Sequence, residues 1–360
     1  MTFRHLERNI EAEGNITAAN HPPRVPVPTK RPNAEQCSSR DFVATYTWLV
    51  IPLGQYPAAG HVIAHISDTH LLGGDKLLYG HVPSDLHIEK AMAQLEKTGI
   101  KFEALVFTGD LADLGERDAY ERLKAIVEPA AARIGAQVIW VMGNHDERPE
   151  YASVLFGEEA TTATQDRVYD INGLRIISLD TTVPGYHHGE LTDEQLAWLA
   201  DILATPAAHG TIIAVHHPPV PTPMLWAMEM LELHDQHRFA DVVRGTDVRA
   251  ILGGHLHYST HSTFVGIPVS VASATCYTLT VGAAGRLFSG VDAGQAFNAV
   301  HVYEDQIVHS IVPIGENEEI TGFSSDNIDL IQSLSFDERL DLFSRKNSQF
   351  NEPGAPTSDF

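Results

Sequence analysis

Polar residues able to hold a metal ion follow five apolar runs of the sequence, at the point where each run ends. They form the motifs Ser67-Asp68-Thr69-His70, Thr108-Gly109-Asp110-Leu111-Ala112-Asp113, Gly143-Asn144-His145-Asp146, His216-His217-Pro218-Pro219 and Gly253-Gly254-His255-Leu256-His257. Carboxylate, amide and imidazole groups without thiolate make a mixed oxygen and nitrogen environment, which suits iron, manganese, zinc or cobalt. The motifs therefore predict a metal site.

The number of candidate ligands indicates two metal ions rather than one. The candidates are Asp68, His70, Asp110, Asn144, His216, His255 and His257. They exceed what one tetrahedral site takes, whereas two metals that share one carboxylate would use them all. Two metals roughly 3.5–4 Å apart can stabilise both the attacking and the leaving oxygen in phosphoryl transfer. The glycines before Asp110, Asn144 and His255 predict tight turns and a close approach of the backbone.

The apolar runs before the motifs are typical of buried strands, and stretches with helical periodicity lie between them. We expect strands at residues 61–66, 104–107, 137–141, 174–179, 211–215 and 248–252, and helices at 84–98, 116–133, 192–204 and 236–244. This alternation predicts an α/β fold, in which ligands gather beyond the carboxyl ends of the strands. All five motifs should open onto one rim, and His187, in the polar loop after the fourth strand, should lie on the same rim.

After residue 262 the pattern changes to β. Strands are expected at residues 263–274, 297–303 and 306–313, with a turn at 303–306 joining the last two. The core should therefore contain sheet beyond one doubly wound unit.

Composition restricts the partners and the compartment. The chain has 360 residues, 43% of them hydrophobic, and carries 24 Lys+Arg against 47 Asp+Glu, a net charge of −23. This charge argues against a nucleic-acid polymer or an anionic membrane as partner. The two cysteines, Cys37 and Cys276, make no disulfide framework or thiolate zinc site, which predicts a reducing compartment such as the cytoplasm. The apolar run at 42–53 is too short to span a bilayer, and we expect no signal peptide.

Three regions are expected along the chain. Residues 1–55 form a proline-rich N-terminal arm, extended or disordered in part, because their polar composition cannot easily pack. Residues 56–316 form the catalytic domain. Residues 317–360 form an acidic tail with one amphipathic stretch near Phe336 to Phe343, which we interpret as a segment for contacts between subunits.

The five motifs, in this order, resemble those of the calcineurin-like metallophosphoesterases. The sequence at residues 65–71, 141–146 and 250–258 resembles more closely that of the class III 3′,5′-cyclic nucleotide phosphodiesterases of the mycobacterial type. The similarity runs from about His61 to Pro313. It implies two mixed β-sheets packed as a sandwich and flanked by helices, in four layers α/β/β/α.

The resemblance also implies how the ligands divide. The first metal would take Asp68, His70 and His257, the second would take Asn144, His216 and His255, and Asp110 would bridge the two. Members of this family commonly use iron with manganese, and zinc, cobalt or magnesium are the alternatives. The enzyme class commonly forms dimers, so we expect a homo-oligomer, either a dimer or a higher assembly.

The implied reaction is hydrolysis of 3′,5′-cyclic AMP to 5′-AMP by a hydroxide that bridges the metals. His145 would give a proton to the leaving oxygen, and Asp113 would orient His145 through a carboxylate–imidazole hydrogen bond. Asp113 could instead cap the helix expected to start near Glu116. The expected substrate contacts are His70, Asn144, His145, His187 and His257, although a polar loop would explain His187 equally well. Asp146 is expected to be a structural turn residue, and His217 a buried histidine with satisfied hydrogen bonds.

Two rival functions remain open. A glycerophosphodiesterase, a 2′,3′-cyclic phosphodiesterase or a broad phosphatase of the same superfamily would share all five motifs. From a different class, a metal-binding scaffold without catalysis would keep the ligands and use the terminal segments for assembly.

Overall fold

The computed structural model describes residues 54–74, 76–280, 282, 285–315, 320 and 328–347. The expected N-terminal arm therefore lies outside the described residues as far as residue 53. In the tail, the described residues form the helical segments α6 (Ile328–Ser333), α7 (Phe336–Arg339) and η4 (Leu340–Ser344). Among the described residues, no helix combines the length and the apolar character needed to cross a membrane.

Two mixed sheets form the centre of the domain. The first has the order β13-β12-β1-β2-β3 and the second the order β4-β5-β6-β7-β9-β8. The first sheet contains β1 (His61–Ile66), β2 (Ala104–Thr108), β3 (Gln137–Val141), β12 (Ala296–Val302) and β13 (Ile307–Pro313). The second contains β4 (Arg167–Ile171), β5 (Leu174–Ser178), β6 (Thr211–Ala214), β7 (Val248–Gly253), β8 (Thr260–Phe264) and β9 (Ile267–Val271). A short ribbon pairs β10 (Thr278–Leu279) with β11 (Gly290–Val291).

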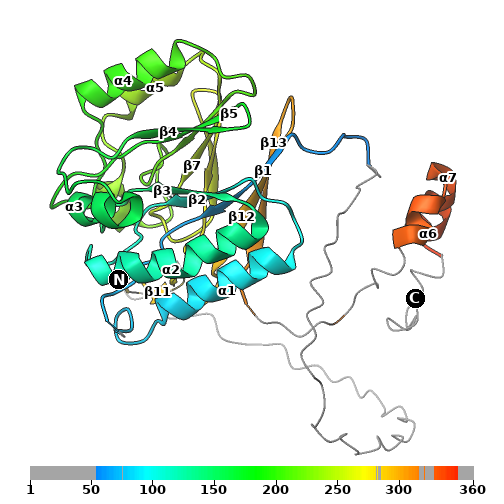
Figure 1. Cartoon of the computed structure of the whole chain (residues 1–360), viewed down its shortest axis with the longest axis horizontal. Helices are drawn as coiled ribbons and strands as arrows, with labels where there is room; N and C mark the ends of the chain where they lie inside the picture. Colours follow the sequence, from blue (N-terminus) through cyan, green and yellow to red (C-terminus); the bar gives the residue numbers. More distant parts are fainter. Residues whose placement is uncertain are drawn as a thin grey trace, which may run out of the picture. The chain divides into compact units, whose positions relative to one another are not determined.

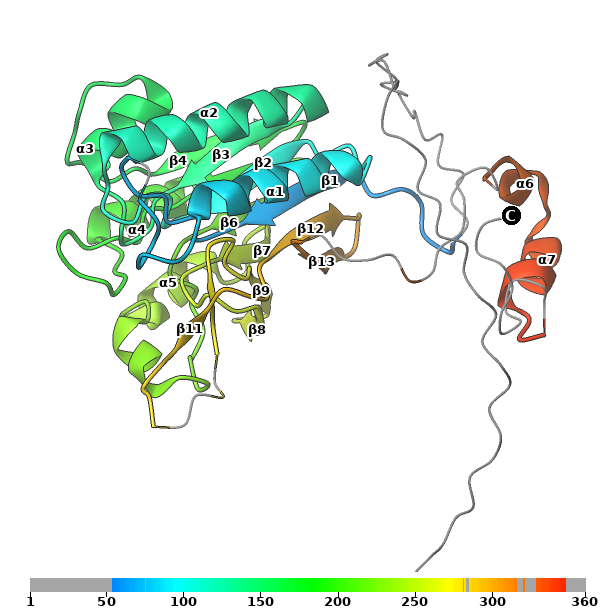
Figure 2. The same cartoon turned by 90° about the horizontal axis from the view of Figure 1, so that it is seen from below.

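Helices cover the outer face of each sheet, so the fold has four layers (Figures 1 and 2). The first sheet packs on α1 (Ser84–Lys97) and α2 (Arg117–Ile134), and the second on α4 (Asp193–Leu203) and α5 (Gln236–Val243). Alternate residues of one strand point to opposite faces of the sheet: Ile63 packs in the core between the sheets, and Ala64 packs against the helices. Strands buried on both faces read as continuous apolar runs, which explains why they could be recognised. The expected α/β/β/α architecture is confirmed.

Short helical turns follow two of the strands. They are α3 (Arg148–Glu150) and η1 (Tyr151–Leu155) after β3, and η2 (Trp226–Leu231) after β6. The expected turn at 303–306 is confirmed, because the backbone N–H of Tyr303 donates to the carbonyl of Gln306 at 2.9 Å.

Two parts of the second sheet differ from the sequence-based prediction. The single strand expected at 263–274 is wrong: Val265 and Gly266, with φ of 46° and 89°, turn the chain there, and Phe264 pairs with Ile267 across the hairpin of β8 and β9. Strand β4 was not predicted. It is an edge strand, and its mixed sequence lacks the continuous apolar character of the buried strands.

Candidate metal centre

The five motifs meet at one end of the sandwich. Asp68, Asp110, His216 and His255 each lie two residues beyond the end of a strand, and Asn144 lies three residues beyond β3. The strands concerned, β1 to β3 in one sheet and β6 and β7 in the other, run parallel within their sheets. The His216 side chain after β6 lies 3.0 Å from that of Asn144 after β3, so the carboxyl ends of both sheets form the single rim that the sequence predicted.

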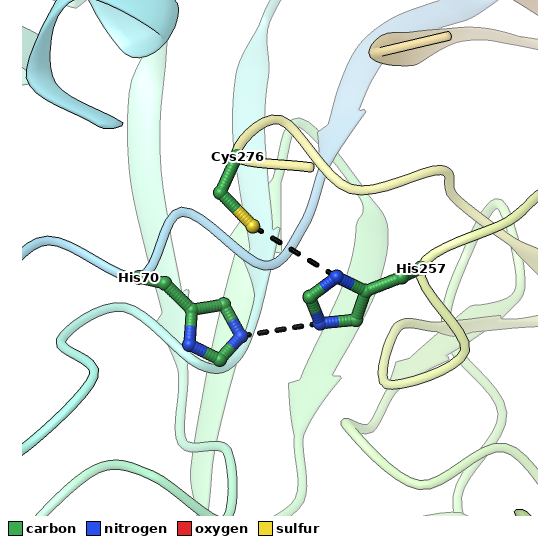
Figure 3. A group of neighbouring side chains, drawn as sticks. All are labelled: His70, His257 and Cys276. Atoms are coloured by element: carbon green, nitrogen blue, oxygen red, sulfur yellow. Dashed lines mark hydrogen bonds between the residues drawn. The ribbon is translucent and has the colours of Figure 1, made fainter. Parts of the chain in front are cut away.

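One group of donor atoms gathers around His70. The Nε2 atoms of His70 and His257 lie 3.2 Å apart, and His257 Nε2 lies 3.4 Å from Asp68 Oδ1. Figure 3 shows the two imidazoles directed toward each other from separate loops. Asp110 Oδ2 lies 3.3 Å from His70 Nε2. These four donors face a common point.

A second group of donor atoms gathers around His216. Its Nε2 lies 3.0 Å from Asn144 Oδ1 and 3.2 Å from His255 Nδ1. The same Asp110 Oδ2 lies 3.3 Å from His216 Nε2. A single carboxylate oxygen therefore stands between the two groups, at equal distance from a histidine of each.

The spacing of these atoms suits bound metal ions. Ligand atoms about 2.0–2.2 Å from one tetrahedral ion lie about 3.3 Å from one another. The separations of 3.0 to 3.4 Å within both groups agree with this value. Nitrogen and oxygen donors with one shared carboxylate fit a pair of borderline or hard cations.

Hydrogen bonds on the outer side of the rings decide which nitrogen faces the centre. His70 Nδ1 donates to Asp113 Oδ1 at 2.9 Å, and His216 Nδ1 donates to the carbonyl of Thr108 at 2.8 Å. Each bond leaves Nε2 unprotonated in the neutral ring and directed at the donor cluster. The tautomers follow from these partners.

Cys276 and Tyr277 border the first group, and sequence reasoning missed both. The carbonyl of Tyr277 accepts a hydrogen bond from His257 Nδ1 at 2.9 Å, and the Tyr277 and His257 ring centroids are 4.4 Å apart. Cys276 Sγ lies 3.8 Å from the same Nδ1, on the side of the ring away from His70 (Figure 3). Burial raises the pKa of the Cys276 thiol to about 12.

The backbone at the rim is strained where the candidate ligands lie. Five of the candidates adopt the left-handed conformation: Asp68 (φ 52°), His70 (45°), Asp110 (50°), His255 (71°) and His257 (54°). Side chains rarely adopt this conformation, which costs about 1–3 kcal/mol per residue and occurs mainly at functional sites. This backbone conformation lowers the stability of the folded protein and directs these side chains toward the two donor groups.

The glycines of the motifs allow the backbone to approach the ligands, as predicted. A Cβ at Gly143 would lie 2.1 Å from Asp110 N, and one at Gly254 would lie 2.0 Å from Ser67 Oγ. Neither position has room for a larger residue. The expected close approach is confirmed.

Charges at the centre are divided between protonated and neutral histidines. Burial would raise the pKa of Asp110, but His216 and His145 hold that pKa well below its usual range. Burial disfavours the charged form of His216, yet Asp110 raises its pKa to about 9. Burial lowers the pKa of His257 to about 4 in spite of Asp68. Since metals bind the neutral imidazole, binding at His216 near neutral pH must release a proton.

His145 and Asp113 lie beside the first group, but they contact each other differently from the expectation. His145 Nδ1 donates to the backbone carbonyl of Asp113 at 2.8 Å, while the Asp113 carboxylate lies 3.5 Å away and bonds His70 instead. The alternative that Asp113 caps the following helix does not apply, because Glu116 is the N-cap of α2. The His145 ring stands edge-on to that of His70, with centroids 4.7 Å apart.

His187 lies on the rim, next to two of the expected site residues. The side-chain amide of Asn144 donates to His187 Nδ1 at 2.8 Å, which turns Asn144 Oδ1 toward the centre. The ring of His187 lies 5.0 Å from that of His145. His187 thus contacts a candidate metal ligand directly, an arrangement that the sequence did not indicate.

Two neighbouring residues are structural, as expected. The Asp146 carboxylate accepts from the backbone N–H groups of Leu111 and Gly143 and from the Tyr120 hydroxyl. His217 is buried; its Nδ1 lies 2.8 Å from Thr181 Oγ1, and its Nε2 donates to a backbone carbonyl. Both nitrogens of His217 therefore have partners.

Comparison with known proteins gives consistent matches over this domain. Residues 61–259 match the family model of the calcineurin-like phosphoesterases. The chain is 55% identical over 273 residues to a cAMP/cGMP dual specificity phosphodiesterase of Mycobacterium tuberculosis, covering 75% of this chain and 85% of that one. It is 29% identical over 216 residues to a 3′,5′-cyclic adenosine monophosphate phosphodiesterase of Vibrio vulnificus, covering 59% and 76%. A dimetal phosphatase from Danio rerio has the same fold, with a TM-score of 0.52 at 15% identity, over 72% of this chain and 98% of that one.

Proposed function

The chain belongs to the calcineurin-like phosphoesterase family, and we propose that it hydrolyses 3′,5′-cyclic AMP to 5′-AMP at a two-metal centre. The resemblance drawn from the five motifs is thereby confirmed at the level of the family and of its mycobacterial phosphodiesterases. The substrate is proposed from the names of these relatives together with the chemistry of the rim.

The position of Asp110 carries the proposal. Its Oδ2 lies 3.3 Å from a histidine of each donor group, as a carboxylate shared by two cations would. We assign Asp68, His70 and His257 to one metal and Asn144, His216 and His255 to the other, with Asp110 common to both. When bound, the pair of ions would supply an activated water and neutralise charge on the phosphate.

His145 is the proposed general acid. Its Nδ1 is held by the carbonyl of Asp113 at 2.8 Å, so Nε2 is the nitrogen free to give a proton to the leaving 3′ oxygen. The Asp113 carboxylate lies 3.5 Å from the same Nδ1. Asp113 therefore acts on both His145 and His70, and we assign it a positioning role.

The substrate would lie along the exposed part of the rim. Asn144, His145 and His187 form a contiguous polar edge there, which we assign to the phosphate together with His70 and His257. On the other side, the Tyr277 ring packs edge-on against that of Tyr79, with centroids 5.5 Å apart. Tyr277 borders His70 and His257, and we assign this aromatic pair to the nucleobase.

Metal identity, assembly and location are proposed on the donor set and the composition. The resemblance to the family favours iron with manganese, and the oxygen and nitrogen donors would also accept zinc, cobalt or magnesium. We propose a homo-oligomer, since the edge strand β13 exposes Val308 and Ile311. Light scattering of the full-length and tail-truncated chains tests that assembly. The small number of cysteines supports a reducing compartment, and we propose the cytoplasm.

The proposed substrate is tested by rates on a panel of phosphoesters with the metal-loaded protein. The panel contains 3′,5′-cyclic AMP, 2′,3′-cyclic AMP, bis-p-nitrophenyl phosphate and p-nitrophenyl phosphate. The proposal expects 3′,5′-cyclic AMP to give the highest kcat/KM. A preference for 2′,3′-cyclic AMP would instead indicate a related phosphodiesterase. Bound metals without turnover of any ester would favour a non-catalytic scaffold.

A further inference from the structure

A cluster of two histidines and one glutamate lies outside the centre described above. His188 Nε2 lies 3.1 Å from Glu190 Oε1, and His234 Nδ1 lies 3.7 Å from the same oxygen. The two imidazole rings stack with centroids 4.2 Å apart and an angle of 21° between their planes. Three potential ligand atoms, one from each residue, all lie within 4.8 Å of one another. We propose that these three residues bind a zinc ion, in a third metal site of the protein.

The chemistry of the cluster fits zinc. Two neutral imidazoles and one carboxylate are a common three-ligand set for Zn²⁺, with water in the fourth position. Donor atoms of a tetrahedral zinc site lie about 3.3 Å apart, close to the separations of 3.1 and 3.7 Å from Glu190 Oε1, and the two stacked rings would have to rotate apart so that one nitrogen of each faces the ion. Glu190 and His234 are about half exposed, which gives the ion and its water access from solvent.

The proposed ion would join two segments that already touch. Glu190 and His188 belong to the loop after β5, whereas His234 follows η2. Backbone hydrogen bonds connect the segments, because Gly189 N donates to the carbonyl of Glu232 at 3.2 Å and His234 N donates to that of Gly189 at 2.8 Å. A metal bound to side chains from both segments would cross-link them.

This cross-link would act on the edge of the candidate active site. His188 directly follows His187, whose Nδ1 accepts from Asn144 at 2.8 Å. The carbonyl of His187 accepts from Nε2 of the buried His217 at 3.2 Å, so this hydrogen bond also holds the loop in place. Zinc at the cluster would reduce the motion of the loop that positions His187, without contributing a ligand to the two-metal centre.

The test compares bound zinc in the full-length wild type and in the double variant His188→Ala/His234→Ala. The proteins are equilibrated at one buffered free Zn²⁺ concentration, and bound metal per chain is measured by elemental analysis. The double variant should hold one equivalent fewer than wild type. His237→Ala, which removes an exposed histidine of the neighbouring helix, should hold the same amount as wild type. Equal zinc contents in all three proteins would overturn the proposal.

Two further measurements separate a metal site from a general structural effect. Glu190→Gln keeps the shape of the side chain, and it should weaken the affinity of the same equivalent at least tenfold. Addition of Zn²⁺ should slow hydrogen exchange at residues 183–190 in wild type but not in the double variant. Exchange that does not respond to zinc in wild type would refute the cross-link. Because none of these readouts depends on phosphodiester hydrolysis, they succeed or fail independently of the proposed activity.

Discussion

Replacing Gly143 with alanine should damage the metal centre far more than its size suggests. The added Cβ would lie 2.1 Å from the backbone N of Asp110 and 2.4 Å from its Oδ1. Ordinary contacts of a carbon atom are about 3.5 Å, so the Asp110 turn would have to move by about 1.4 Å. Functional metal sites tolerate shifts of only about 0.2 Å in ligand distance.

The expected consequences follow from this displacement. Asp110 Oδ2 is equidistant from His70 and His216, so a shift of its turn separates it from both. Gly143→Ala should lose bound metal, and kcat/KM for 3′,5′-cyclic AMP should fall at least about 100-fold, the usual result of a misplacement near 1 Å. The crowding should lower the free energy of unfolding by about 1–3 kcal/mol.

Gly60→Ala is the matched control for this variant. Gly60 precedes β1 at the opposite end of the sheet, and its Cβ would meet only the carbonyl of Val302, at an ordinary 3.6 Å. Its metal content and activity should equal those of wild type, with a stability change within about 0.5 kcal/mol. Metal content is measured by elemental analysis and stability by urea unfolding. Full metal content and full activity in Gly143→Ala would show that the Asp110 turn accommodates the added Cβ, contrary to the prediction.

Further predictions concern the residues around the centre. His145→Ala should lower kcat about 10²–10⁴-fold with little loss of bound metal, when activity and metal content are measured on the same preparation. A parallel loss of activity and of bound metal would indicate that His145 is a metal ligand. Asp113→Asn should weaken metal affinity about 10–100-fold in chelator competition, because the carboxylate holds His70 Nδ1; unchanged affinity would contradict this. Tyr277→Ala should raise KM for 3′,5′-cyclic AMP more than for bis-p-nitrophenyl phosphate, whereas equal effects would remove its assignment to the nucleobase. Burial, with a contribution from His309, lowers the pKa of His65 from 6.5 to about 3 in the folded protein. Between these two values His65 is protonated in the unfolded chain but neutral in the folded one, so the free energy of unfolding falls as the pH drops below 6.5. By pH 5 this loss is about 2 kcal/mol, and urea unfolding of His65→Asn at pH 7 and 5 should lack it; an identical pH dependence would contradict the prediction.

The central strands could be predicted because both of their faces are buried. Ile63 and Ala64 pack into different cores, so the run that contains them is apolar throughout. The edge strand β4 carries Arg167 and Asp170 and gives no such signal. The hairpin at Val265 was hidden because valine rarely takes a positive φ, and its local sequence looked like one continuous strand.

The positions of the candidate ligands could be predicted from their motifs, but their surroundings could not. Cys276 and Tyr277 lie in an irregular segment after β9, and contact with His257 arises only when β7 and β9 pair in the folded sheet. The contact of the Asp113 carboxylate with His70 rather than with His145 depends on a side-chain direction, which residue spacing does not determine. The spacing of the residues also does not predict the left-handed backbone conformation of Asp110 and of the other candidate ligands.

The most direct test of the proposed function is the rate of 5′-AMP formation from 3′,5′-cyclic AMP by metal-loaded wild type and by metal-loaded Asp110→Asn. We expect wild type to turn over 3′,5′-cyclic AMP, with the activity abolished by a chelator and restored by added metal, and we expect Asp110→Asn to lose most of this activity. A wild type that holds its metals without forming 5′-AMP would contradict the proposed function. Undiminished turnover by Asp110→Asn would contradict the shared-carboxylate centre.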